Sequence, residues 1–130
     1  MPSIWGRTTV LVRDYAEALD FYRDGFDFEP IFDSGPENEA NPIRFLHLGH
    51  AGVATLWLIK ASENEQHLIG TQTGSEPLGV LYVDDLDIAL EKLARIGAVP
   101  TTAPSADATS RFAHVPDLYG NDIIIVQMIR

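Results

Sequence analysis

The sequence predicts an α+β fold built from two tandem β-α-β-β-β modules. An internal repeat superimposes residues 12–19 on residues 83–90 without a gap, at the 71-residue separation of Asp14 from Asp85. Both copies run in the same order, from an apolar strand through an aspartate and an amphipathic helix to a glycine. We therefore expect one domain over residues 1–130. Its expected parts are module one (about 4–60), a linker (61–77) and module two (about 78–130).

In each copy an aspartate marks the expected start of a helix. Asp14 and Asp85 precede the helical patterns, and a carboxylate there can accept hydrogen bonds from the free amides of the first turn. Glu17 follows Asp14 by three residues, as in a capping box. Gly25 and Gly97 indicate where the helices end. The apolar stripes that predict the buried helix faces are Tyr15, Ala18, Leu19 and Tyr22, and Leu86, Ala89, Leu90 and Leu93.

The other strands are expected in apolar runs that turn-forming residues separate. Residues 53–59 and 123–129 are apolar on nearly both faces. A strand with one wet face alternates apolar and polar residues, so these two must be covered by helices on one side and by a core or an apolar ligand on the other. The expected strands are 28–33, 43–48 and 53–60 in the first module, and 98–101, 111–115 and 122–129 in the second.

Composition excludes several classes of function. The formal net charge is −10 and there is no cysteine. Nucleic-acid binding needs clustered Lys and Arg, so we expect no nucleic-acid partner. Disulfides and thiolate sites are excluded. No apolar run approaches the length of a membrane span and the N-terminus lacks a signal-peptide pattern, so we expect a cytoplasmic protein without a membrane partner. The acidic charge either favours cationic small molecules or only keeps the surface soluble.

A short turn motif before the last strand adds a family resemblance. Residues 116–121 read Pro-Asp-Leu-Tyr-Gly-Asn. Together with the two strand–Asp–helix units, this motif resembles the glyoxalase/bleomycin-resistance/extradiol-dioxygenase superfamily, also called vicinal oxygen chelate; the chain departs from its turn only in having Leu118 for Pro. The resemblance covers nearly the whole chain. It implies a curved mixed sheet with four strands from each module, helices outside, and a ligand pocket on the concave side.

The resemblance also implies where a metal would lie. Metalloenzymes of the superfamily hold a divalent ion with His, Gln or Glu at four positions, which fall on Arg7, Trp57, Leu78 and Ile124 here. Three of these side chains offer no lone pair and the fourth is a permanent cation. We therefore expect neither a metal nor another cofactor. The histidines lack metal-binding spacing and are expected to be surface or structural residues: His47, His50, His67 and His114.

Strand periodicity, anchored by the resemblance, predicts an apolar and aromatic pocket with few polar groups. Arg7 is its most informative member, because a buried guanidinium needs a carboxylate such as Asp122 or an anionic ligand. The alternative is that Arg7 lies at a strand end and reaches solvent. Trp57 either belongs to the core or stacks on a planar or cationic ligand. The predicted pocket residues are Arg7, Thr9, Thr55, Trp57, Leu78, Val80, Tyr82, Asp122 and Ile124.

These expectations favour a metal-free, small-molecule-binding protein that resembles the bleomycin-resistance branch and forms a homodimer. Such a protein sequesters a drug-like or metabolite ligand. The alternative is an enzyme of the same superfamily, a lyase, isomerase or dioxygenase, that uses a divalent metal or acts without one. A third reading is a domain without a ligand that serves an interaction. The sequence identifies no catalytic residue, because it contains no nucleophile motif, phosphate loop or dinucleotide fingerprint.

Overall fold

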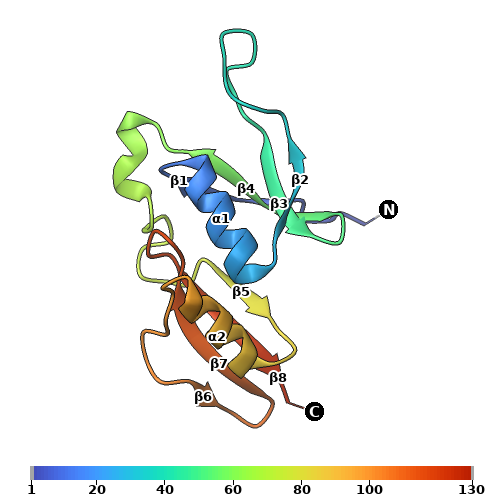
Figure 1. Ribbon diagram of the computed structural model, residues 1–130, viewed down its shortest axis with the longest axis vertical. Coiled ribbons are helices and arrows are strands. Elements are labelled where there is room, and N and C mark those ends of the chain that lie inside the picture. Colours follow the sequence, from blue (N-terminus) through green and yellow to red (C-terminus); the bar gives the residue numbers. More distant parts are fainter. Residues whose placement is uncertain (1, 130) are drawn as a thin grey trace.

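In the computed structural model, two modules of the same design lie one above the other, each with its helix against its own sheet (Figure 1). The structure describes residues 2–129. The α+β class and the two β-α-β-β-β modules are confirmed. The elements are β1 (Thr8–Val12), α1 (Tyr15–Phe26), β2 (Glu29–Asp33), β3 (Leu46–His50), β4 (Val53–Lys60), the 3₁₀ helix η1 (Glu63–Leu68), β5 (Gly79–Tyr82), α2 (Leu86–Arg95), β6 (Ser105–Ala106), β7 (Ser110–Pro116) and β8 (Asp122–Met128).

The strand order is the same in both modules. The strands form two four-stranded sheets, ordered β1-β4-β3-β2 and β5-β8-β7-β6. In each sheet the first strand pairs in parallel with the last, and the other neighbours are antiparallel. The repeat in the sequence is therefore a repeat in topology.

The expected helix starts are confirmed. The Asp14 carboxylate accepts a hydrogen bond from the Glu17 N–H at 2.9 Å, and Asp85 accepts one from the Ile88 N–H at 3.1 Å. The expected stop at Gly25 is wrong, because α1 continues to Phe26 and the left-handed residue after it is Asp27, with φ 59°. A Cβ at Gly25 would lie 2.9 Å from side-chain carbons of Leu93 and Ile96, so this glycine lets α2 and the residue after it approach.

Two expected strands differ from the structure. No strand forms over residues 98–101, because Ala98 still completes the end of α2 by donating its N–H to Leu93 O, and Pro100 has no N–H for a ladder. The edge strand is β6, further along the chain. In the first module β3 begins at Leu46 instead of residue 43. Arg44, ahead of it, forms a two-bond ion pair with Asp33.

One hydrophobic core joins the modules. It fills the space between the helices and the inward faces of both sheets, and α1 and α2 contact one another. Within this core Tyr22 donates its hydroxyl proton to Asp117 at 2.7 Å. Burial, followed by the charge of Asp117, raises the pKa of Tyr22 well above its ordinary value. The bond ties the first helix to the second module.

Asp117 also organises the turn that carried the family resemblance. Its carboxylate accepts hydrogen bonds from the backbone N–H groups of Tyr119 and Asn121, both at 2.9 Å, and from the Asn121 side chain at 2.9 Å. The Tyr119 hydroxyl reaches back to the first module and donates to Glu17 at 2.8 Å. Burial, and then this bond to Glu17, raises the pKa of Tyr119 to about 12. The motif therefore fastens the second module to the start of α1.

The segment between the modules covers the free edge of β1. Gln72 donates from its side-chain amide to Thr9 O at 2.7 Å and accepts the Leu11 N–H at 2.9 Å. These two bonds occupy backbone groups of β1 that an unpaired edge strand would otherwise offer to another chain. No helix in the described part of the chain is long and apolar enough to cross a membrane.

Candidate functional site

Each sheet has an inner face against the helices and an outer face turned away from them. In the first sheet Val10, Leu46 and Leu58 are fully buried in the core, so their neighbours along the strands lie on the outer face. Trp57 lies directly between Thr9 on β1 and His47 on β3. Residues paired across strands share a face. Two predicted pocket residues, Thr9 and Trp57, are thus brought together beside a histidine that the pocket prediction did not include.

Four rings form an aromatic patch on this outer face: Phe32, Phe45, His47 and Trp57. Phe45 is stacked on Trp57, with ring centroids 5.5 Å apart and an interplanar angle of 21°. His47 contacts Trp57 edge to face and also lies beside Phe32. Phe45 stays 40% exposed. Solvent, or a ligand, can therefore reach the aromatic patch at Phe32, which is 53% exposed, and at Phe45.

Two nitrogen atoms in the aromatic patch lack hydrogen-bond partners among residues 2–129. They are His47 Nε2 and Trp57 Nε1, and both are shielded from solvent. The whole of His47 is only 9% exposed. A buried donor or acceptor without a partner costs about 1–3 kcal/mol, so such groups are uncommon in folded proteins and call for an explanation. Neither atom has accessible surface in the free chain, so a partner from outside reaches them only when the side chains that cover them move.

Arg7 supplies positive charge close to the aromatic patch. It lies just before β1 and is exposed, which agrees with the solvent-reaching alternative. Burial lowers the pKa of His47, and the charge of Arg7 lowers it further, so the imidazole is neutral at pH 7. Arg7 forms no ion pair with any residue from 2 to 129, and Asp122 bonds His114 Nδ1 at 2.8 Å instead. The considered Arg7–Asp122 pair is not formed.

The other predicted residues lie at or near the second sheet. Val80 is paired with Ile124, and both alternate with core residues, so they share its outer face. Val80 is 52% exposed and Tyr82 is 69% exposed. Thr55, Leu78 and Val80 do meet, at a 140 Å³ cavity between the modules that also touches Tyr22 and Phe28. The nine predicted residues are thus distributed over two outer faces and one small cavity.

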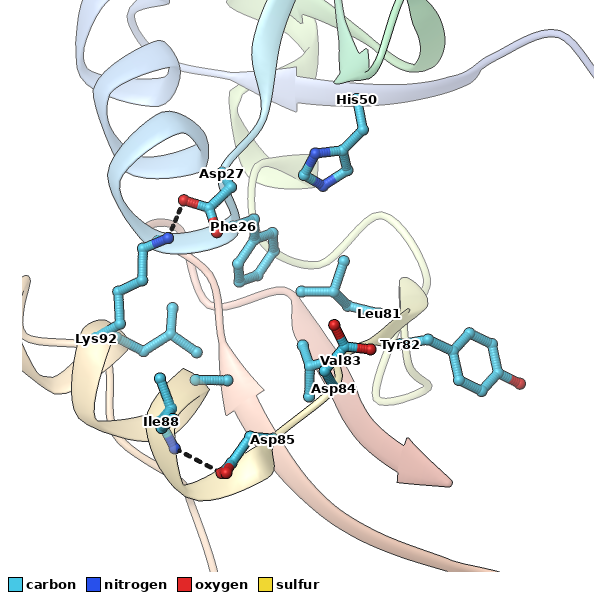
Figure 2. A pocket seen from close by; sticks show the side chains of 13 residues that line it. Phe26, Asp27, His50, Leu81, Tyr82, Val83, Asp84, Asp85, Ile88 and Lys92 are labelled. Atoms are coloured by element: carbon cyan, nitrogen blue, oxygen red, sulfur yellow. Dashed lines mark hydrogen bonds and ion pairs between the residues drawn. The ribbon is translucent and has the colours of Figure 1, made fainter. Parts of the chain in front are cut away.

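A larger hollow, of 390 Å³, was not anticipated from the sequence. It lies where the end of α1 meets the start of α2 (Figure 2). His50 points into it from one side, Asp84 and Asp85 lie across from His50, and Lys92 at its edge pairs with Asp27. Tyr82, the one predicted pocket residue at this hollow, points away from it. The sequence offered only the Asp84-Asp85 pair as a signal, and that pair also fits a helix cap.

The side chains present do not fit a divalent metal at the positions that the family resemblance indicated. Arg7, Trp57, Leu78 and Ile124 offer no suitable lone pair. Over the described range, no three His, Cys, Asp or Glu side chains gather where they could hold an ion. His50 packs edge-on against Phe28 at 4.6 Å between ring centroids. The absence of a metal stays a prediction.

Comparisons with known proteins agree with this architecture. The model of the Glyoxalase/Bleomycin resistance protein/Dioxygenase superfamily matches residues 5–125. An uncharacterized protein of Shewanella frigidimarina (strain NCIMB 400) is 32% identical over 114 residues, which are 86% of this chain and 84% of that protein. The crystal structure of UcmS2 has a TM-score of 0.76 at 23% identity, with 97% and 98% of the two chains covered. TnmS3, an antibiotic binding protein from Streptomyces sp. CB03234, has a TM-score of 0.74 at 25% identity, with 98% of each chain covered.

Proposed function

Because the chain belongs to the Glyoxalase/Bleomycin resistance protein/Dioxygenase superfamily, we propose that it is a metal-free protein that binds planar organic molecules on its aromatic patch. The observation that carries this proposal is the pair of shielded nitrogens without partners, His47 Nε2 and Trp57 Nε1. A bound molecule that displaces the side chains covering these two atoms would give both of them hydrogen-bond partners. Binding would then remove the free-energy cost of leaving these two nitrogens without partners.

The shape of the aromatic patch supports a flat ligand. Phe45 and Trp57 already stack, and aromatic pairs prefer offset-stacked or edge-to-face contacts. A planar ring placed against the exposed Phe45 would continue that arrangement. Ligand sites generally combine apolar and aromatic walls with a few well-placed polar groups. The patch has this composition, with His47 and Trp57 as the polar groups and Arg7 at its margin.

The relatives support binding in preference to turnover. TnmS3 is an antibiotic binding protein, and its fold is shared by this chain along nearly its whole length. Sequestration requires affinity and shielding but no catalytic group. The aromatic patch itself contains no acid or nucleophile beyond a neutral imidazole. We therefore place the chain with proteins that retain a compound, a drug or a metabolite, without changing it.

A second copy of the chain would complete the site in this proposal. Val80, Tyr82 and Phe45 are large apolar side chains left exposed on the outer faces of the two sheets. Large apolar side chains left exposed on sheet faces favour an interaction site, and homodimers are the commonest oligomers. Light scattering should give about twice the 14.3 kDa of the chain. A mass that stays at one chain at high concentration would contradict the dimer.

The Trp57 indole gives a direct test of ligand binding. The chain has two tryptophans, so a ¹⁵N spectrum of the Trp5→Phe variant leaves the indole N–H signal of Trp57 alone. Titration with the neutral planar compound 2-naphthamide should move this signal, with affinity read by calorimetry. Phe45→Ala should weaken binding by about 5- to 10-fold, because aromatic pairs contribute about 0.5–1.5 kcal/mol beyond buried area. Equal affinity in Phe45→Ala would remove the aromatic patch as the site.

One observation favours the enzyme as a second candidate. On the second sheet His114 Nδ1 contacts Asp122 at 2.8 Å, and the two side chains are 36% and 28% exposed. A carboxylate that fixes one imidazole nitrogen leaves the other free to move a proton, as a general base does in lyases and isomerases. If the chain is such an enzyme, His114→Gln should abolish its turnover and His47→Gln should preserve it. Turnover equal in both variants would reject it.

A further inference from the structure

We propose that the compound held by the aromatic patch is an aromatic carboxylate, whose oxygens accept hydrogen bonds from Trp57 and His47 while Arg7 balances the charge. This inference rests on the proposed function, since it names the chemical class of the ligand at the same site. Three groups on the first sheet or at its edge would hold the compound, and none of them requires a metal.

Trp57 sets the first requirement. An indole nitrogen only donates, so the atom that meets Trp57 Nε1 must be an acceptor. A cationic amine has no acceptor to offer there and would leave the nitrogen without a partner. A ligand that displaces the side chains covering this edge of Trp57 must therefore present an oxygen, or an equivalent acceptor, to Nε1.

His47 sets the second requirement. Its neutral imidazole can carry its proton on Nε2 and donate it. His47 and Trp57 are directly paired across β3 and β4, and their ring centroids are 5.7 Å apart. A carboxylate has two acceptor oxygens on one carbon, so one group can accept a hydrogen bond from each of the two nitrogens. An amide oxygen is neutral and can accept both bonds only where the two donors converge on it.

Charge sets the third requirement. Arg7 is the cation whose field reaches His47, and it is not neutralised by an ion pair within residues 2–129. Two other guanidinium groups near this sheet already have carboxylate partners: Arg44 is held by Asp33 through two bonds, and Arg13 pairs with Glu17. The chain as a whole carries −10, but at physiological salt the Debye length is about 8 Å, so distant acidic groups are screened. The local field at the aromatic patch therefore favours an anion.

The test compares three compounds that share one ring system and differ in charge: 2-naphthoate, 2-naphthamide and 2-naphthylmethylamine. Calorimetry on the intact chain should rank naphthoate first, about 10-fold tighter than the amide, with the amine weakest. In the Trp5→Phe background, naphthoate should move the Trp57 indole proton downfield. Arg7→Gln should weaken naphthoate by about 10-fold and change the amide by less than about 2-fold.

Two further variants complete the design. His47→Phe keeps a ring and removes Nε2, and it should weaken naphthoate by about 5-fold or more while the fold, judged by the amide spectrum, is retained. Arg95→Gln removes an exposed arginine from the last turn of α2 and serves as the matched control, with unchanged affinity. An Arg95→Gln loss equal to that of Arg7→Gln would show a general charge effect and overturn the assignment of Arg7.

The outcomes separate this inference from the proposed function. The carboxylate inference is wrong if the amine binds as tightly as naphthoate, or if naphthoate does not move the Trp57 signal. Binding of the other compounds would in that case still support the proposed site. If none of the three compounds binds, the proposed function itself fails. If the Trp57 signal shifts on dilution of the protein alone and naphthoate then moves it no further, a second copy already partners the two nitrogens, and the carboxylate inference is overturned.

Discussion

The outer faces of the two sheets share one topology and differ in chemistry. In the first, His47 and Trp57 hold shielded nitrogens without partners beside stacked rings. In the second, His114 is bonded to Asp122, and the large exposed side chains include Val80 and Tyr82. The inner faces are alike, because both must pack against a helix. The comparison teaches that the repeat conserves what folding requires and leaves the outer faces free to acquire different roles.

The largest expected effect concerns the bond network that holds the two modules together. Asp117→Ala should lower the free energy of unfolding by about 3–4 kcal/mol, because it removes a buried carboxylate with four hydrogen bonds and leaves Tyr22 without its acceptor. Urea denaturation at neutral pH measures this. Tyr82→Phe, which removes an exposed hydroxyl, is the control and should be neutral. A loss below about 1 kcal/mol for Asp117→Ala would mean that packing alone joins the modules.

The two outer faces should respond with opposite signs to the loss of a histidine. His47→Leu replaces a shielded imidazole without a partner and should stabilise the free protein by about 1 kcal/mol. His114→Leu removes the partner of Asp122 and should destabilise by about 1 kcal/mol. Thermal and urea unfolding of both variants give the comparison. Destabilisation by both substitutions would contradict a net cost of the shielded His47 imidazole in the free protein.

The helix caps should respond equally in the two modules. Asp14→Ala and Asp85→Ala each remove one carboxylate that accepts a first-turn N–H, and each should cost about 1 kcal/mol. Replacement by Asn should restore most of that loss, because Asn caps as well as Asp. The unfolding free energies of the four variants measure both the loss and its recovery in each module. A cost confined to one module would show that the repeat is not energetically symmetric.

The smallest expected effect is a pH dependence of stability that comes from His47 on the outer face of the first sheet. The pKa of His47 is lowered in the folded state from its ordinary 6.5, so the unfolded chain binds the proton more readily. The free energy of unfolding should therefore rise with pH until the pH exceeds the pKa of His47 in the unfolded chain, and it should fall as the pH drops below that pKa. His47→Leu should flatten this part of the curve between about pH 7 and pH 5. An identical slope in wild type and variant would contradict the shielding of His47.

Much of the fold could be predicted because its signals are local. The caps at Asp14 and Asp85 depend on residues within one helical turn, and the strand alternation on neighbours two apart. The strand expected at 98–101 failed because Pro100 and the completion of the helix end outweighed a short apolar run. Sequence spacing predicts a helix stop at Gly25 because it does not show the side chains of Leu93 and Ile96 that lie against this glycine.

The sequence by itself determined the two modules, their order of elements, the helix starts and the turn before the last strand, since each follows from residues close together along the chain. Only the tertiary structure decided that Tyr22 reaches Asp117, 95 residues away, and that His47 lies opposite Trp57. The physical reason is that register and module contact are set by the packing of a shared core. A pattern of residue types can say which side chains face outward, but the pairing of strands decides which of them meet.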